Sequence, residues 1–358
     1  MSTTETPQLD QSKLDAFVGR FLGDLGTAMH LPTVLVGDRL GLYRAMADGE
    51  LVTPAELAER TGTNERYVTE WLAAQAAAGY VDYDAGASAF RLPPEHAALL
   101  IDQGAPVFIP GAFQLAASTV KDEPLITEAF RTGEGVAWHD HHPDLFVGCE
   151  RFFRPGYAAH LIDEWLPALD GVEVKLRAGA KAADVGCGHG ASTVIMANAF
   201  PNSSFVGFDY HDASIEAARR AADSAGLGAR VRFDVASAQD FPGTNYDFVA
   251  FFDCLHDMGD PVGAARHVRS TLAPDGTWMI VEPYANDRLE DNLNPVGKIY
   301  YNASTLICTP ASRAQEVGLA LGAQAGEDLT RNVVTEAGFT NFRRVAETPV
   351  NIVYEAGP

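Results

Sequence analysis

A glycine-rich segment headed by an acidic residue is the clearest candidate for chemistry in this sequence. Residues 184–190 read Asp-Val-Gly-Cys-Gly-His-Gly, between an apolar run at 182–185 and a run with helical character at 192–200. Glycine has no Cβ and tolerates positive φ, so such a loop lets the backbone approach a ligand closely. Phosphate-binding loops instead present N–H groups to an anion, and the P-loop adds a lysine. Because Asp184 would repel a pyrophosphate, the loop favours a ligand that is cationic or rich in hydrogen-bond donors.

A second acidic residue follows the next apolar run. Residues 204–209, Ser-Phe-Val-Gly-Phe-Asp, are typical of a strand that ends at Asp209. In doubly wound folds an acid at the end of the second strand commonly binds ribose hydroxyls. The chain therefore pairs a glycine loop with a ribose-binding acid and offers no phosphate site beside them.

A histidine follows a third apolar run, at residues 247–252, in the segment Asp253-Cys254-Leu255-His256-Asp257-Met258. Ligands in open α/β folds bind beyond the carboxyl ends of the strands, so His256 is expected at the site. An imidazole titrates near neutral pH and can take a proton from a hydroxyl group. The alternative is that His256 caps the following turn or bonds a nearby carboxylate.

These residues together resemble the class I S-adenosylmethionine-dependent methyltransferases, and the winged-helix O-methyltransferases of small molecules in particular. The resemblance implies that His256 deprotonates the acceptor hydroxyl, that Glu282 orients it, and that Asp257 lies beside it; Glu282 could equally be a solvent-facing strand end. It implies S-adenosylmethionine as cofactor and a homodimer. The residues it places at the cofactor are Asp184, Gly186, Cys187, Gly188, Gly190, Asp209, Tyr210, Ala236, Ser237 and Asp253.

The resemblance has two departures and leaves the methyl acceptor open. Ser237 stands where the family often has an acid that bonds the adenine amino group, and Met258 stands where a tryptophan is usual. N-methylation, C-methylation or a different reaction on the same fold stay as alternatives. Four residues from the aromatic-rich connector and from the insertion after residue 282 are expected to line the acceptor site: Trp138, Phe153, Tyr300 and Asn302.

The elements that must position these residues alternate between strand and helix. Strands are expected at 182–185, 205–209, 231–235, 247–252 and 278–282, with helices near 192–200, 213–225 and 262–272. This alternation predicts an α/β fold with a largely parallel sheet. Two further β-rich runs, at 342–346 and 350–355, fit the antiparallel hairpin of a seven-stranded Rossmann-like methyltransferase sheet. The predicted domains are a winged helix at 1–105, a connector at 106–170, helical in its second half, and the cofactor-binding domain at 171–358.

The winged-helix prediction rests on local signals in the first hundred residues. Thr53-Pro54-Ala55-Glu56 is a capping box, a second helix follows the turn at 61–63, and a hairpin is expected over 80–92. A DNA-binding regulator is the competing interpretation. Residues 1–100 hold seven Lys or Arg and fourteen Asp or Glu, a net charge of −7 that would repel phosphates. Dimerisation and capping of the substrate site are therefore the expected roles.

Composition narrows the remaining classes. The chain has 358 residues, 47% of them hydrophobic, and a formal net charge of −22, which disfavours nucleic acid and anionic membranes as partners. The sequence has no apolar run long enough to span a membrane, and the polar N-terminus, residues 1–11, is expected to be a disordered tail. The four cysteines are expected to be free thiols in a cytoplasmic protein. No metal site is expected, because the histidines of residues 138–142 adjoin one another in a loop.

Overall fold

The computed structural model describes residues 9–228 and 230–358. The chain divides into two compact units, Met1–Ala117 and Ser118–Pro358. Most of the expected N-terminal tail, residues 1–8, lies outside the described residues, and the first helix begins at Gln11 with Asp10 as its N-cap.

The first unit is a winged helix preceded by a long helix. Its helices are α1 (Gln11–Arg39), α2 (Pro54–Thr61), α3 (Glu65–Ala77) and α4 (Pro94–Leu100), with a short 3-10 turn at Arg44–Met46. The capping box at Thr53 and Glu56 is present, as expected. Strands β1 (Asp82–Asp84) and β2 (Ala89–Arg91) pair antiparallel and form the wing. The predicted order of helix, turn, helix and hairpin is confirmed.

A buried glutamine organises the contact between α1 and α3. Gln75 accepts a hydrogen bond from the Tyr43 hydroxyl (2.6 Å) and donates one to the Thr33 hydroxyl (3.1 Å). The indole N–H of Trp71 donates to the Thr33 carbonyl (2.8 Å). A Cβ at Gly37 would lie 2.5 Å from the Trp71 ring, so the close packing of α1 on α3 requires glycine there. These hydrogen bonds fix the position of α1 along α3 in a core that is otherwise apolar.

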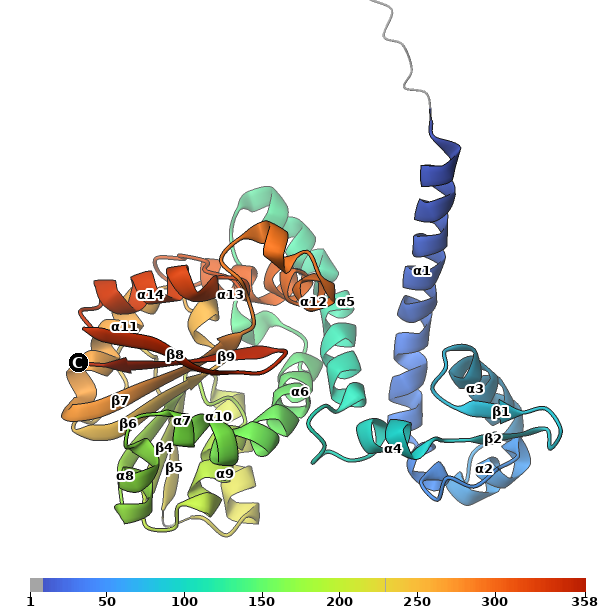
Figure 1. The fold of residues 1–358 in the computed structure, drawn as a ribbon, viewed down its shortest axis with the longest axis horizontal. Helices are drawn as coiled ribbons and strands as arrows, with labels where there is room; N and C mark the ends of the chain where they lie inside the picture. Colours follow the sequence, from blue (N-terminus) through green and yellow to red (C-terminus); the bar gives the residue numbers. More distant parts are fainter. Residues whose placement is uncertain (1–8, 229) are drawn as a thin grey trace, which may run out of the picture. The chain divides into compact units, whose positions relative to one another are not determined.

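The second unit contains a seven-stranded sheet with the order β5-β4-β3-β6-β7-β9-β8 (Figure 1). Strands β3 to β7 are parallel to one another, and β9 runs antiparallel to both β7 and β8. The expected α/β fold with a mostly parallel seven-stranded sheet is confirmed. The strands are β3 (Lys181–Val185), β4 (Ser204–Asp209), β5 (Val231–Val235), β6 (Tyr246–Phe252), β7 (Leu272–Pro283), β8 (Asn341–Glu347) and β9 (Asn351–Gly357).

Helices cover both faces of this sheet and bury two apolar clusters. On one face α8 (Val172–Ala178), α9 (Ala191–Ala199) and α10 (Asp212–Ser224) pack against residues such as Phe205, Phe233 and Phe248. On the other face α11 (Pro261–Thr271) and α14 (Gly326–Glu336) pack against Phe251, Trp278 and Ile280. The central strands are therefore apolar on both sides, which leaves their carboxyl ends as the place for polar side chains.

Three elements differ from the sequence-based expectation. The connector is helical earlier than expected, with α5 (Ile109–Thr132) and α6 (Asp144–His160), because Pro124 and Pro155 lie inside these helices instead of ending them. Helix α6 continues as a π-helix at Leu161–Trp165 and a short α7 (Leu166–Ala168). Strand β7 begins at Leu272, since its pairing with β6 passes through residues 274–276 as a register shift. The insertion after β7 contains η5 (Leu289–Asn292), α12 (Pro295–Ala303), a π-helix at Ser304–Cys308 and α13 (Thr309–Arg313).

Two sequence-based expectations concern the whole chain. The four cysteines are all free thiols, as expected. Among the described residues, no helix is both long and apolar enough to cross a membrane.

Candidate active site

The glycine loop turns the chain from β3 into α9. The N–H groups of Gly186 and Cys187 both donate to the Phe208 carbonyl of β4, at 2.8 and 3.0 Å. Gly186, Gly188 and Gly190 all have positive φ, between 51° and 78°. A Cβ at Gly186 would lie 2.6 Å from the Cys254 sulfur, and one at Gly190 would lie 2.7 Å from the Phe233 ring. Gly186 and Gly190 are thus required by packing within the protein.

Gly188 is different, because a Cβ there would meet nothing within 4 Å. Replacing Gly188 by Ala is expected to cost about 1–2 kcal/mol of stability for the left-handed backbone. The same change should weaken S-adenosylhomocysteine binding by roughly tenfold or more, since the added methyl group enters the space where backbone can approach a ligand. Calorimetry and thermal unfolding measure the two effects separately.

Gly62 provides a matched control for this substitution. It ends α2 at φ 64° and a Cβ there would also meet nothing within 4 Å. Gly62→Ala should lower the melting temperature as Gly188→Ala does and leave cofactor affinity unchanged. Equal cofactor affinity in the Gly188→Ala variant and the unaltered protein would show that the loop does not contact the cofactor.

Asp184 is a buried acid at the end of β3, with 1% of its surface exposed. Its Oδ2 accepts hydrogen bonds from the hydroxyls of Ser192 and Thr193 at the start of α9, both at 2.6 Å. Its Oδ1 is buried without a hydrogen-bond partner among the described residues. Burial raises the pKa of Asp184 to about 6, although the two hydroxyls act in the opposite direction. A buried acceptor without a donor is costly, and a cationic or N–H-bearing ligand would satisfy it.

Asp209 lies at the end of β4 and contacts the same loop. Its Oδ2 accepts from the Gly188 N–H and its Oδ1 from the His211 N–H, both at 2.9 Å. Burial raises the pKa of Asp209, and these two N–H groups partly oppose the rise. The next residue, Tyr210, is 44% exposed. The loop and the second acid are therefore joined, as their spacing in the sequence predicts.

The segment after β5 places a carboxylate beside Ser237. The Ala236 N–H donates to the Asp209 carbonyl at 3.0 Å, which holds this segment beside β4. The Ser237 hydroxyl donates to Asp240 Oδ1 at 2.6 Å. Asp240 was not among the residues expected at the cofactor, because the turn that returns its carboxylate to Ser237 has no strong local signal in the sequence.

The segment after β6 packs directly on the glycine loop through Cys254, whose thiol also donates to the Val185 carbonyl at 3.3 Å. Asp253 has a φ of 51°, which is uncommon for a residue other than glycine and is typical of functional sites. Its Oδ2 accepts from the Tyr157 hydroxyl and its Oδ1 from the Asn351 amide, both at 2.8 Å. Burial raises the pKa of Asp253 to about 8, and the nearby Glu282 adds to the rise.

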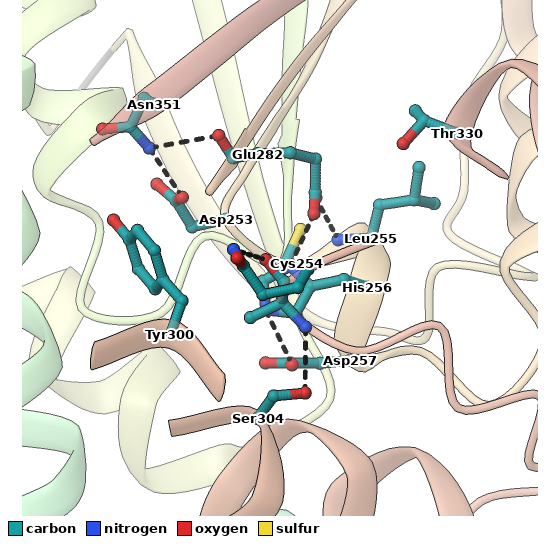
Figure 2. Close-up of polar contacts among 12 residues, drawn as sticks. Asp253, Cys254, Leu255, His256, Asp257, Glu282, Tyr300, Ser304, Thr330 and Asn351 are labelled. Atoms are coloured by element: carbon teal, nitrogen blue, oxygen red, sulfur yellow. Dashed lines mark hydrogen bonds and ion pairs between the residues drawn. The ribbon is translucent and has the colours of Figure 1, made fainter. Parts of the chain in front are cut away.

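His256 lies in a 3-10 turn, Leu255–Asp257, and both of its ring nitrogens face carboxylates (Figure 2). Nδ1 is 2.6 Å from Glu282 Oε2, and Nε2 is 3.0 Å from Asp257 Oδ1. Glu282 is only 6% exposed and its Oε1 also accepts from the Leu255 N–H at 3.0 Å. Burial acts to lower the pKa of His256, but the charges of Asp257 and Glu282 outweigh it and raise this pKa well above 6.5. The histidine is therefore held tightly and is a stronger base than a free imidazole.

The residues expected at the acceptor lie in varied surroundings. Tyr300 is buried near this cluster, since the charge of Asp253 acts with burial to raise its pKa, and its hydroxyl donates to the Val350 carbonyl (2.8 Å). Asn302 is exposed and donates to Lys298 of its own helix (2.6 Å). Phe153 stacks on Tyr157 with ring centroids 6.1 Å apart. Trp138 lies 5.5 Å from the Phe146 ring, which lies 4.5 Å from His211.

The site residues fit S-adenosylmethionine. That cofactor carries a cationic sulfonium, an ammonium group and ribose hydroxyls, and the ends of β3 and β4 offer the acids Asp184 and Asp209. Among the described residues, Asp184 Oδ1 has no hydrogen-bond donor, and the space beside Gly188 is open. The carboxylate of Asp209, at the end of the adjacent strand, accepts a hydrogen bond from the Gly188 N–H. The raised pKa values of Asp184 and Asp253 follow from buried negative charge that a cation would offset.

Each unit contains a segment that matches a known protein family. Residues 176–337 match the methyltransferase domain family, and residues 28–101 match the Rv2258c-like winged HTH domain family. The 27-O-demethylrifamycin SV methyltransferase of Amycolatopsis mediterranei is 34% identical over 104 residues, covering 28% of this chain and 38% of that protein. This chain covers less than half the length of the curated relatives it matches.

Solved structures share the fold over the whole chain. An O-methyltransferase family protein from Burkholderia thailandensis has a TM-score of 0.69 at 18% identity, covering 98% of both chains. Human N-acetylserotonin methyltransferase in complex with SAM has a TM-score of 0.68 at 15% identity, covering 100% of both chains. The chain is thus a methyltransferase-fold protein with an N-terminal winged-helix domain, as the sequence predicts.

Proposed function

We propose that this protein transfers a methyl group from S-adenosylmethionine to a hydroxyl group of a small molecule. The observation that carries the proposal is the packing of the His256 segment on the cofactor loop, through Cys254 against Gly186. This packing joins a carboxylate-bound histidine to a loop whose acids suit a cationic cofactor. S-adenosylmethionine supplies an electrophilic methyl group, so the protein has to align an acceptor oxygen and remove its proton.

His256 is the group that takes the proton in this proposal. Glu282 bonds Nδ1, so the lone pair of a neutral His256 is at Nε2. When Nε2 accepts the hydroxyl proton, Glu282 and Asp257 stabilise the imidazolium that forms. The two carboxylates raise the pKa of His256, which makes it a stronger base than a free imidazole. Turnover should therefore rise with pH, with the acid limb of kcat/KM above pH 6.5.

The cofactor assignment is tested first by calorimetry with S-adenosylhomocysteine. Wild-type protein should bind it, and Asp209→Ala should bind it more weakly because the ribose loses its charged acceptor. Absence of binding to folded wild-type protein would exclude the proposed function. The acceptor is then sought with methyl-labelled S-adenosylmethionine and a panel of phenols, amines and carbon nucleophiles, in which labelled ethers identify O-methylation.

We also propose that the protein is a homodimer that pairs through α1. The described part of this helix carries an exposed apolar stripe at helical spacing: Leu14, Phe17, Val18, Phe21, Leu22, Leu25 and Met29. Phe17 is 62% exposed and Met29 is 68% exposed. A contiguous apolar surface of this kind is unfavourable in water and is typical of a protein–protein interface. A nucleic-acid partner is not favoured, since Arg66 of α3 is paired with Glu70 on a unit of negative charge.

Replacing Phe17 and Phe21 together by Glu is expected to give a monomer in light scattering coupled to size exclusion. The four charges placed across a two-fold interface would repel one another and cost several kcal/mol of association. The matched control is Val174→Glu, on the exposed face of α8 with 71% exposure, which should leave the mass unchanged. A dimeric Phe17→Glu/Phe21→Glu variant would place the interface elsewhere.

A further inference from the structure

A sulfur atom lies beside the proposed base, in a position that the methyl-transfer chemistry does not use. Cys308 ends the π-helix Ser304–Cys308 and is buried. Its Sγ, a ring nitrogen of His256 and a carboxylate oxygen of Asp257 all lie within 4.8 Å of one another. Tetrahedral zinc ligands with bonds of about 2.0–2.3 Å lie roughly 3.3–3.8 Å apart. The three side chains are therefore close enough to share one ion after small rotations.

One of these groups has a buried oxygen that makes no hydrogen bond of good geometry among the described residues. Asp257 Oδ1 is 3.0 Å from His256 Nε2, yet this buried oxygen makes no hydrogen bond of good geometry with any described residue. The other ring nitrogen, Nδ1, is held by the buried Glu282 at 2.6 Å. A histidine that binds zinc almost always donates its second N–H to a carboxylate in this way.

The negative charge around these three side chains also favours a bound cation. Three carboxylates, those of Asp253, Asp257 and Glu282, lie around His256 (Figure 2). A divalent cation would offset this concentration of buried acids, and a set of N, S and O ligands suits zinc.

We infer that His256, Asp257 and Cys308 bind a zinc ion, and that bound zinc inhibits methyl transfer by occupying the nitrogen that accepts the proton. Binding of the ion stands on the three ligands alone. The inhibitory consequence rests on the proposed function, because it requires His256 to be the base.

The binding experiment uses tag-free, full-length protein with cobalt(II) as a spectroscopic substitute for zinc, in a buffer without thiol reductants. Wild-type protein should show a thiolate-to-cobalt charge-transfer band and tetrahedral d–d bands at one equivalent, and one equivalent of zinc should displace them. Cys308→Ser should lose the charge-transfer band, whereas Cys149→Ser, the nearby thiol outside the trio, should keep it. Glu282→Gln should weaken cobalt binding by about 10–100-fold, as loss of a partner to a metal-bound histidine does.

Folding of each variant is checked by S-adenosylhomocysteine calorimetry, and Cys308→Ala replaces the serine variant if that one does not fold. No cobalt band in the wild-type protein, or an unchanged band in Cys308→Ser, would overturn the site. On the acceptor found in the labelling assay, zinc should inhibit the wild-type protein at a concentration at least tenfold lower than it inhibits Cys308→Ser. Equal inhibition of the two would overturn the regulatory role while leaving the cobalt result as evidence of binding, and a missing acceptor would concern the proposed function alone.

Discussion

Replacing His256 by Ala is expected to lower kcat by about 10²–10⁴-fold, the range that general-base catalysis contributes. S-adenosylhomocysteine affinity should change little, because the cofactor is assigned to the residues of the glycine loop and β4. Such a split between turnover and binding is expected of a residue that acts on the proton. The measurement is steady-state methyl transfer beside calorimetry on the same preparation.

Glu282→Gln provides the companion to this experiment. The amide keeps the shape of the side chain and removes the charge that helps to raise the His256 pKa. The acid limb of kcat/KM should then move to lower pH, while the plateau falls because the imidazolium is less stabilised. Full turnover in His256→Ala would exclude the base assignment. An unmoved acid limb in Glu282→Gln would show that Glu282 has only a structural role.

Replacing Asp184 by Asn is expected to weaken cofactor binding and to stabilise the ligand-free protein above pH 6. The folded pKa of Asp184 is about 6 and its ordinary value is 3.8, so the folded chain holds a proton that the unfolded chain releases. Stability therefore falls as pH rises from about 4 to above 6. A difference of about two pKa units corresponds to about 3 kcal/mol at pH 8, or roughly 5–10 °C in melting temperature. The amide carries no charge and should not show this loss.

The design compares the melting temperatures of variant and wild type at pH 5 and at pH 8. Taking the difference between the two pH values removes any cost that the amide has at all pH values, such as an unpaired N–H. Asp223→Asn, an exposed acid near the end of α10, is the control and should show no pH-dependent gain. S-adenosylhomocysteine should bind Asp184→Asn about 10–100-fold more weakly, the loss typical of a hydrogen bond to a charged group. Unchanged affinity would contradict the role of Asp184 at the cofactor.

Local sequence signals were sufficient wherever the chain forms structure from neighbouring residues. The Thr53–Glu56 capping box depends on contacts within one helical turn, and it is present in the structure. The alternation of strands and helices from residue 181 onward also follows from burial patterns that are local in the chain. The connector was harder to predict, because proline inside α5 and α6 resembles a helix boundary in the sequence.

In the candidate site, too, some features follow from neighbouring residues in the sequence and others depend on tertiary packing. Asp184, the glycines and Asp209 could be placed together from the sequence, since the carboxyl ends of adjacent parallel strands meet at one edge of a sheet. Nothing near His256 in the sequence indicates Tyr157, Asn351 or Cys308, which come from a connector helix, the last strand and the insertion. Asp253 is bonded by residues 96 and 98 positions away from it. Such contacts depend on how whole elements pack, and no local spacing encodes them.

The sequence by itself determined the fold class, the glycine loop and the strand ends that hold Asp184, Asp209 and His256, because these follow from burial period and glycine geometry over short stretches. Only the tertiary structure decided the surroundings of His256 and the direction in which they shift its pKa. The buried Glu282 and Asp257 raise its pKa, and Cys308 is brought beside it from the insertion. Burial removes the water that would otherwise screen these charges, so the same residue types acquire different chemistry once they are packed together.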